Sequence, residues 1–562
     1  MNKKILIILL IVIVLELTLF NVNSYRVLNS NSKKEYSKED FEYVYTEEED
    51  EVYIKIDNIN TEIKTIHIEL DTEEAVDYQV LYTDATSSSL KELPRKKYID
   101  TCEKSKYIPC YLSGESKLIG IKVFSDTVDF EKIIINEKIP FEFNFTRVIT
   151  LFGITIFIYL LKTHECYKLP YSIKNFEQEL SLIFVVCVFI LITCLINQYS
   201  TNVEEIKDFY SVDFVDALSK GQVHLGEKPS KKLMDLENPY DGGERIRAGL
   251  KRGSDYLWDV AYFEGKYYVY FGIFPAILML PYHLITGNYI GTPMAVLIFS
   301  ILTAISFKVL IENIFKRYFS EVPFKFMIFS LLMLLFGSQI LWVNGIPRFY
   351  ELSIISALFF ASVGINFVFS TLEKEKSRYI NMFFACLFLS LAVACRPTQL
   401  LTSLVFLPML IGIFIKNIKE KKDIIKNLLA VLIPYCVVGI ALMYYNYTRF
   451  GSIFEFGAGH QLTINDMKNL DNRFMTIGMG IVCSLFSIPH FLPNFPFMIY
   501  HNNLLTFYGY YYIENVMGGL FAMVPICLFI FGIYKVWKRT DNKRLLYFTT
   551  TVLSVRFVNL YS

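Results

Sequence analysis

The sequence of 562 residues carries no net charge, because 55 lysines and arginines balance 55 aspartates and glutamates. A neutral chain gives no reason to expect a nucleic-acid partner, since nucleic acids are bound by basic surfaces. Histidine is scarce, with seven residues, and His224, His283 and His460 stand apart without the spacing of a metal site. No motif therefore indicates a metal site. A divalent cation stays possible as a cofactor only because carboxylates are present.

The first apolar segment, residues 5–20, is not followed by the small-residue cleavage pattern of a secretory signal peptide. We therefore interpret residues 1–22 as a retained membrane anchor rather than as a signal peptide. Lys3 and Lys4 precede the segment, and the positive-inside rule then places this end of the chain in the cytoplasm.

Apolar residues are abundant, at 53% hydrophobic and 16% aromatic, which is too apolar for an ordinary soluble protein. Uncharged runs of about 20 residues recur, and each is long enough to cross a bilayer as a helix. The sequence predicts a mostly α, polytopic membrane protein of about eleven transmembrane segments. The expected segments are 5–20, 148–161, 180–197, 290–314, 325–343, 350–370, 379–395, 399–415, 427–445, 517–535 and 545–560.

Residues 25–140 have a different character. Runs such as VYIKI (52–56) and IGIKV (119–123) alternate between apolar and polar residues, with polar turns between them. This pattern predicts a small antiparallel β-domain of sandwich type, held outside the membrane between two anchors, with scaffolding favoured over carbohydrate binding. Cys102 and Cys110 are its only cysteines, and an exported location would permit a disulfide between them.

Two transmembrane helices are expected within residues 145–197. Residues 198–287 follow as an extracytoplasmic loop that closes in an apolar, aromatic segment containing Pro275 and Pro281. Long ordered loops are often functional, so we interpret this one as the catalytic loop. If this apolar segment crossed the bilayer fully, every later basic loop would lie outside. If it is re-entrant, those loops all lie inside, and two prolines in a short run favour such a broken helix, so we expect a re-entrant segment. Residues 288–562 then form a multi-helix membrane domain with an outer loop at 446–516.

This topology places three arginines on the outer side, Arg348, Arg396 and Arg449, each at the outer end of a membrane helix. A charge at such a place is costly and usually has a partner. Snorkelling towards lipid headgroups explains any one of these arginines. It explains three of them less well, because they lie on the side opposite the basic loops.

Resemblance to a known family lies in five stretches: DALSKGQ, NPYDGGER, WDVAYFEGKYYVYFGIFPAILMLPYHLITG, ACRPTQLL and NYTRFGSIFEFG. Together they resemble the polytopic GT-C glycosyltransferases, and within these the bacterial proteins described as glycosyltransferase family 39-like or dolichyl-phosphate-mannose-protein mannosyltransferase-like. The resemblance covers residues 180–535 and leaves out the β-domain. One departure is that the acidic pair often found early in the first outer loop is not a clean Asp-Glu or Asp-x-Asp, since Asp213 and Asp216 are three apart.

The resemblance implies transfer of a sugar from a polyprenyl-phosphate donor in the lipid bilayer to an extracytoplasmic glycan, lipid or protein. A carboxylate would take the proton of the acceptor hydroxyl. Basic side chains, and the forked donors of arginine in particular, would hold the leaving phosphate. The candidate bases are Asp259, Asp241, Asp216 and Asp213, and the candidate phosphate ligands are Arg396, Arg449, Arg348 and Lys266.

Several of these residues also have a plainer interpretation. Asp213 and Asp216 could lie on a solvated helix face, Asp241 could be a turn residue, and Lys266 could snorkel at the interface. Two other classes of protein stay open. A transporter or flippase of lipid-linked sugars should show internal repeats and ionisable residues near helix centres, and neither is clear. A non-catalytic envelope assembly protein would leave the gathering of polar residues at 208–265 unexplained.

Overall fold

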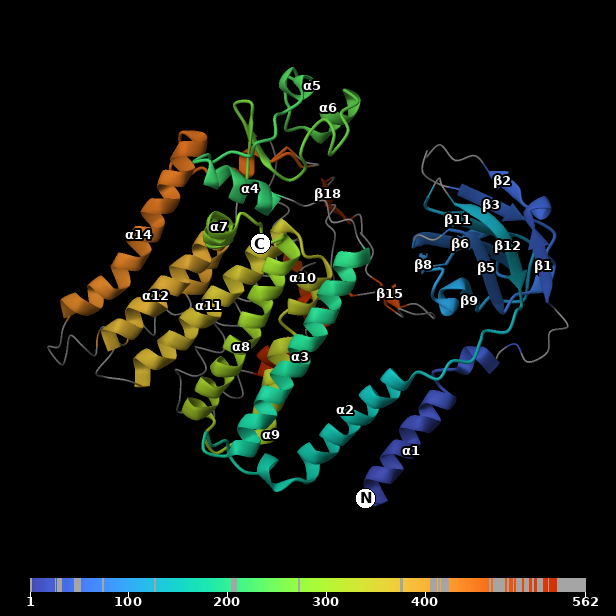
Figure 1. The fold of residues 1–562 in the computed structure, drawn as a ribbon, viewed down its shortest axis with the longest axis horizontal. Helices are drawn as coiled ribbons and strands as arrows, with labels where there is room; N and C mark the ends of the chain where they lie inside the picture. The colour runs from blue at the N-terminus through green and yellow to red at the C-terminus, as the bar shows by residue number, and fades with distance from the viewer. Residues whose placement is uncertain are drawn as a thin grey trace. The chain divides into compact units, whose positions relative to one another are not determined.

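The computed structural model describes residues 3–25, 27, 33–44, 52–72, 75–93, 95–125, 128–203, 210–270, 273–373, 378–404, 412, 415, 424–463, 466–467 and short stretches between 481 and 532. The chain divides into two compact units, Met1–His164 and Glu165–Ser562. The protein is mostly helical, and its first unit is rich in β-structure (Figure 1). This confirms the predicted fold class at the level of secondary structure.

The first unit begins and ends with apolar helices, α1 (Lys3–Leu17) and α2 (Phe145–Thr163), which pack on each other. Glu16 is the one acidic residue of α1, and its side chain is fully buried. Its carboxylate accepts hydrogen bonds from Arg147 Nε (2.7 Å), Arg147 Nη2 (2.6 Å) and the Asn144 backbone N–H (2.9 Å). A forked, charge-assisted pair of this kind offsets the cost of burying the charge, so it fastens α1 to α2.

Two antiparallel sheets lie between these helices in the sequence. The first has the order β1 (Lys34–Ser37), β12 (Asp129–Ile135), β5 (Thr65–Asp71) and β9 (Tyr107–Pro109). The second has the order β2 (Glu42–Val44), β3 (Val52–Ile56), β11 (Ile119–Val123), β6 (Val76–Asp84) and β7 (Ser87–Glu92), with β8 (Lys96–Tyr98) also on β6. A short pair, β4 (Thr61–Glu62) and β10 (Glu115–Ser116), stands apart.

The alternation seen in the sequence explains how these sheets pack. Ile54 and Ile121 face each other across β3 and β11, and both are fully buried. Ile68 and Ile133 do the same across β5 and β12. All four belong to one apolar cluster to which both sheets contribute. Residues two apart in a strand share a face, so the period-two pattern supplies this core.

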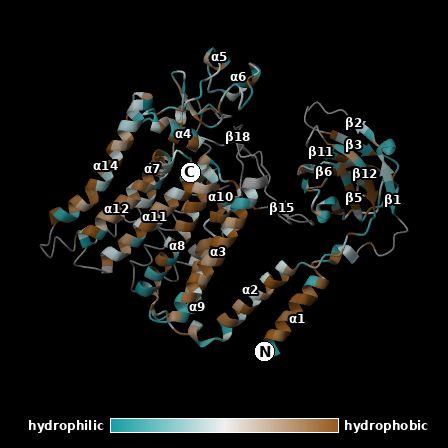
Figure 2. Cartoon of the chain, viewed as in Figure 1, coloured by the Kyte–Doolittle hydropathy of each residue, from teal (hydrophilic) through white to brown (hydrophobic). Residues whose placement is uncertain are grey.

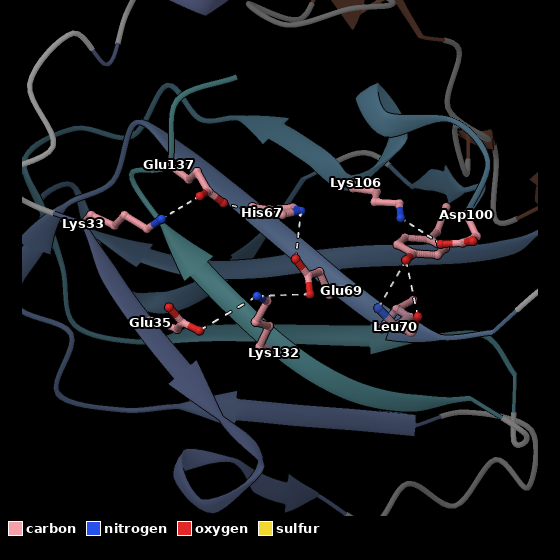
Figure 3. Close-up of polar contacts among 10 residues, drawn as sticks. Lys33, Glu35, His67, Glu69, Leu70, Asp100, Lys106, Lys132 and Glu137 are labelled. Carbon is pink, nitrogen blue, oxygen red and sulfur yellow. Dashed lines mark hydrogen bonds and ion pairs between the residues drawn. The ribbon is translucent and has the colours of Figure 1, made fainter. Parts of the chain in front are cut away.

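A polar cluster lies on the first sheet (Figure 3). The His67 ring is buried and stacks on Tyr107 with centroids 4.1 Å apart. Its Nδ1 is hydrogen-bonded to Glu137, which also accepts from Lys33 Nζ at 2.6 Å, and its Nε2 lies 3.7 Å from Glu69. Burial raises the pKa of Glu137, but the hydrogen bonds from Lys33 and His67 outweigh it and leave that pKa below its ordinary value. The cluster ties β5 to the segment that follows β12.

The predicted disulfide between Cys102 and Cys110 is wrong, since neither cysteine is in a disulfide. Cys102 is exposed just before a short 3-10 helix, η3 (Glu103–Lys106). Cys110 is buried in the core, with its Sγ 3.7 Å from the Ile108 carbonyl. One thiol therefore faces solvent and the other faces the interior, and spacing in the sequence carries no information on that difference.

Among the described residues, seven helical stretches are long and apolar enough to cross a membrane (Figure 2). They are Phe145–Thr163 (α2), Phe176–Ser200 (in α3, Phe176–Val203), Thr292–Tyr318 (α8), Phe324–Gly345 (α9, Phe324–Phe336, with α10, Ile340–Gly345), Phe349–Leu372 (in α11, Phe349–Glu373), Arg378–Cys395 (α12) and Ile424–Phe450 (α14). The multi-helix membrane character is thus supported.

The count of eleven segments is not confirmed. The helix α1, with 15 residues, is shorter than these seven. About half of the expected segment 399–415 and all of 545–560 fall outside the described residues. Within 517–535, the described residues form a short helix, α16 (Leu520–Met523), and a 3-10 helix, η7 (Pro525–Gly532), rather than one long α-helix.

Polar side chains join helices of the second unit at two levels. Asn197 of α3 donates to Asn344 (3.2 Å), which donates to Ser300 of α8 (2.7 Å). Nearer the start of α3, Lys308 of α8 pairs with Glu179 at 3.0 Å. Hydrogen bonds between apolar helices of this kind are typical of membrane proteins, where they fix one helix against the next.

The aromatic segment after the polar loop forms α7 (Ile273–Thr286), with Pro281 inside it. Fourteen residues at 1.5 Å each give a helix of about 21 Å, short of the roughly 30 Å hydrocarbon core. The helix packs on the amphipathic helix α4 (Tyr210–Ser219) and on α11 and α12. Its length is compatible with the predicted broken or re-entrant helix.

The Glu16 contact generates a stability prediction. Glu16→Gln removes the charge that pairs with Arg147, and we expect it to destabilise the first unit by about 1.5–3 kcal/mol, the usual worth of a hydrogen bond to a charged group. Thermal unfolding of the purified protein in detergent, followed at the α1–α2 pair by a fluorophore on α1, should show the lower transition.

Glu142→Gln is the matched control, because Glu142 lies nearby and is exposed in its ion pair with Lys104. Exposed pairs contribute little, so the transition should not move. Equal effects of the two substitutions would contradict the assignment of the Glu16–Arg147 pair as the fastening contact.

Candidate functional site

A short hairpin organises the site. Strands β13 (Ala261–Phe263) and β14 (Lys266–Tyr268) pair antiparallel around Glu264 and Gly265, which both have positive φ (47° and 72°). Two successive residues of positive φ make the tight turn that matches the twist of a hairpin, and glycine adopts it without strain. The sequence EGK therefore folds the polar loop back on itself.

The register of this hairpin brings Asp259 and Tyr270 together. Ala261 pairs with Tyr268, so the residues two positions further out, Asp259 and Tyr270, lie across from one another at its open end. The Tyr270 hydroxyl donates to Asp259 Oδ1 at 3.2 Å. Asp259 itself has φ of 60°, a conformation uncommon for a residue with a Cβ and frequent at functional sites.

A second segment closes the site from far along the chain. Residues 457–463 follow α14, and there the Leu462 carbonyl accepts from the Asp259 N–H (3.1 Å) while the Leu462 N–H donates to Val260 (2.9 Å). These bonds hold Gln461 beside the hairpin, where its Nε2 donates to Asp259 Oδ1 and to the Tyr270 hydroxyl (2.7 Å). One carboxylate oxygen thus accepts from both a phenol and an amide.

A buried guanidinium lies near the same tyrosine. Burial raises the pKa of Tyr270 well above its ordinary value, the Asp259 charge and Tyr350 raise it further, and the positive charge of Arg396 opposes them. The phenol therefore keeps its proton and acts as a donor. Arg396, 7% exposed, donates to the Tyr350 hydroxyl at 2.5 Å and lies over that ring at 4.6 Å.

The position of Arg396 follows from the next residue. Pro397 disfavours the helical conformation of the residue before it, so α12 ends at Cys395 and Arg396 is extended, with φ of −150° and ψ of 116°. The chain then turns through a 3-10 helix, η5 (Pro397–Gln399). This break directs the arginine from the end of α12 towards Tyr350 at the start of α11.

Arg449 is the third participant, in the last turn of α14. It is 3% exposed, and its Nη1 donates to the Val269 carbonyl (2.5 Å) while its Nη2 donates to Asn446 (2.7 Å). The guanidinium also lies 3.9 Å from the Tyr445 ring centroid. The bond to Val269 holds the residue next to Tyr270, so Arg449 supports the position of that tyrosine. Its predicted role as a phosphate ligand stays a prediction.

The other candidate aspartates lie on other elements. Asp213 is exposed in the first turn of α4. Asp216, on the same helix, accepts from Lys220 Nζ (2.6 Å) and from the Tyr289 hydroxyl (3.0 Å), and the lysine hydrogen bond, followed by that of the tyrosine, lowers its pKa. Asp216 is thus already paired with Lys220 and Tyr289.

Asp241 is the N-cap of the short helix α6 (Gly242–Arg247), where its side chain accepts from the Gly243 N–H at 2.9 Å. This is the turn role that its sequence context also allowed. Lys266 is exposed at the start of β14, and Arg348 is exposed in the connection between α10 and α11. Of the predicted site residues, Asp259 bonds to Tyr270, Arg396 lies near that tyrosine, and Arg449 bonds to the neighbouring Val269.

Among the described residues, none of the four candidate aspartates belongs to a group of three or more metal-ligating side chains. A divalent cation at the site therefore remains only a prediction from the presence of carboxylates.

The sequence analysis did not identify four residues of this site: Tyr270, Gln461, Tyr350 and Gly457. Gly457 has φ of 92°, and a Cβ there would lie 2.8 Å from the Phe450 ring and 3.0 Å from Tyr270 Cβ. Only glycine fits such a close approach. The run EFGAGHQ has two glycines and polar residues soon after an arginine-bearing helix, a pattern that indicates a close backbone approach. Nothing in the run indicates that the hairpin is the segment that approaches.

Comparison with known proteins identifies no relative: no family model, no curated protein and no solved structure matches the chain. The geometry of the site and the residues that build it are therefore the basis for a functional proposal.

Gly457 provides a test of how tightly the site is built. Gly457→Ala should destabilise the protein by about 1–3 kcal/mol, because the new methyl group meets Phe450 and Tyr270 in a conformation that alanine disfavours. Thermal unfolding in detergent measures it. Gly451→Ala is the matched control, since Gly451 also has positive φ (67°) but has open space around it. An equal loss in both variants would show that backbone strain alone, without crowding at Tyr270, sets the cost.

Proposed function

We propose that this protein is a multi-pass membrane glycosyltransferase of GT-C type. It moves a sugar from a polyprenyl-phosphate donor to an extracytoplasmic acceptor, which is a glycan, a lipid or a protein. The observation that carries the proposal is the Asp259 carboxylate, held by Tyr270 and Gln461, with the buried Arg396 close enough to act on the pKa of that tyrosine. The earlier resemblance of the same stretches to GT-C enzymes supports the same reaction.

The proposed chemistry assigns one role to each side chain. Asp259 takes the proton of the acceptor hydroxyl as its oxygen attacks the anomeric carbon of the donor sugar. The bond from that carbon to the phosphate oxygen breaks, and the phosphate leaves with its negative charge on the polyprenyl carrier. Arg396 offers the forked, permanently charged donors that suit this phosphate.

The neighbouring helix α7 suits a lipid carrier. Its residues Ile277, Leu278 and Ile285 are exposed although they are large and apolar (41%, 46% and 84%). Exposed apolar side chains on a short helix are favourable next to a lipid tail and costly in water. We place α7 as the re-entrant segment along which the polyprenyl chain approaches.

The orientation and the full segment count belong to the same proposal. About eleven segments, with the starting end of the chain in the cytoplasm, put every basic loop inside and place the β-domain, of sandwich type, and the catalytic loop outside. Polyprenyl-phosphate sugars presented on the outer face would then meet Asp259 directly. The β-domain serves as a scaffold or acceptor-side module in this arrangement.

Accessibility of single cysteines tests this orientation. In a cysteine-free background, Ser254→Cys and Asn465→Cys should react with an impermeant thiol reagent on intact cells, because both lie in outer loops. Lys421→Cys should react only after lysis. Labelling of the Lys421→Cys variant on intact cells would mean that α7 is a full crossing and that the proposed active-site face is inverted.

Catalysis is tested by removing the proposed base. Asp259→Asn keeps size and polarity, and it should lower sugar transfer by roughly 10²–10⁴, the usual contribution of a positioned general base, with little effect on donor binding. Arg396→Lys keeps the charge but loses the fork, and it should weaken donor binding. The assay is transfer from radiolabelled polyprenyl-phosphate sugar to membrane or wall acceptors in vesicles.

Asp241→Asn is the matched control, because Asp241 is a helix cap in the same loop, and its transfer rate should stay near that of the unchanged protein. An unchanged rate for Asp259→Asn would contradict the assignment of the base. If the unchanged protein consumes no donor but moves lipid-linked sugar across vesicle membranes, a flippase is the correct class. If it shows neither transfer nor movement of lipid-linked sugar, the result favours a non-catalytic envelope assembly protein.

A further inference from the structure

We infer that Tyr270 and Gln461 are positioning residues that hold the Asp259 carboxylate ionised and aimed at the acceptor. The inference rests on the proposed function and names two residues that the reaction itself does not consume. Neither carries a formal charge, so neither is an obvious candidate from sequence.

The hydrogen bonds form a closed triangle. Tyr270 donates to Asp259 Oδ1 (3.2 Å), and Gln461 Nε2 donates both to that same oxygen and to the Tyr270 hydroxyl (2.7 Å). Because both donors act on one oxygen, rotation of the carboxylate would break two bonds together. The triangle therefore fixes the direction of the carboxylate more firmly than either donor alone.

Each corner of the triangle is anchored separately. The Asp259 N–H to Leu462 carbonyl bond (3.1 Å) and the Leu462 N–H to Val260 carbonyl bond (2.9 Å) fix Gln461 relative to Asp259. The close fit of Gly457 against Tyr270, and the bond from Arg449 to the Val269 carbonyl (2.5 Å), fix the tyrosine. Supporting contacts of this kind hold a reactive group within the narrow range of geometry that catalysis requires.

The electrostatic surroundings point in the same direction. The charged and titratable groups that bear on Tyr270 are Asp259 of its own loop, Tyr350 of α11 and Arg396 at the end of α12. Burial keeps the phenol protonated, so it remains a donor across the neutral range. Hydrogen bonds donated to a carboxylate favour its charged form. Loss of either donor should therefore require a higher pH before the base becomes active.

The experiment compares pH–rate profiles of sugar transfer by the full chain in vesicles. Tyr270→Phe and Gln461→Leu should each move the acidic limb of the profile upwards by about one pH unit, the order expected for one hydrogen bond to a charged group. They should lower kcat while leaving KM for the polyprenyl-phosphate donor near that of the unchanged protein. A role in folding alone would lower the amount of active enzyme without moving the limb.

Tyr240→Phe is the matched control. Tyr240 is another partly buried tyrosine of the same loop, and its hydroxyl bonds to the Tyr262 carbonyl (2.9 Å) and to His460 Nδ1 (3.3 Å). Its profile should keep the original acidic limb. A fluorinated tyrosine at position 270 covers the case in which Tyr270→Phe does not fold, because it keeps the hydroxyl and makes it a stronger donor, so the limb should move downwards.

Failure of this inference differs from failure of the proposed function. If Asp259→Asn abolishes transfer while the acidic limb stays in place in Tyr270→Phe, in Gln461→Leu and with the fluorinated tyrosine, the positioning role is overturned and Asp259 remains the base. If Asp259→Asn transfers sugar at the original rate, the proposed function itself fails. Shifted limbs in both donor variants, with an unmoved limb in Tyr240→Phe, support the inference.

Discussion

A polar group that leaves water must find a partner, and this constraint determines how the apolar part of the protein is built. The buried carboxylate of Glu16 is stabilised by two hydrogen bonds from the Arg147 guanidinium. The buried amide of Asn344 is stabilised by hydrogen bonds with Asn197 and Ser300. The same requirement acts on Arg449, which satisfies two of its donors on a backbone carbonyl and an asparagine. Each such contact joins two segments, so the polar minority fixes how the apolar majority packs.

At the candidate site this constraint acts on three elements at once. The hairpin brings Asp259 and Tyr270, the segment after α14 brings Gln461, and the break after α12 brings Arg396. Each element is local and simple: a glycine turn, a left-handed glycine and a proline that ends a helix. The aspartates that stand outside this convergence have local roles instead, with Asp241 capping a helix and Asp216 paired with Lys220. Convergence, rather than the presence of a carboxylate, separates Asp259 from the rest.

Features that depend on neighbours in sequence could be predicted from it. Alternation in VYIKI and IGIKV predicts two strands, and the long apolar runs predict the membrane-length helices. The pairing of Ile54 with Ile121 comes from the structure. Contacts between distant segments could not be predicted in this way. Gln461 lies 202 residues from Asp259, and the pairing depends on the register of the hairpin and on a glycine that admits Tyr270. Cys102 and Cys110 show the same limit at short range, since one faces solvent and the other the core.

This arrangement has a consequence for how the site forms. Asp259 and Tyr270 can meet once the EGK turn closes, which requires only local folding. Gln461 and Arg396 lie on segments that follow α14 and α12, so their places near Tyr270 depend on those helices. The position of the carboxylate thus depends on a short loop, whereas its surroundings depend on helices from elsewhere in the second unit. The two donors on Asp259 Oδ1 therefore come together only where the hairpin meets the segment after α14.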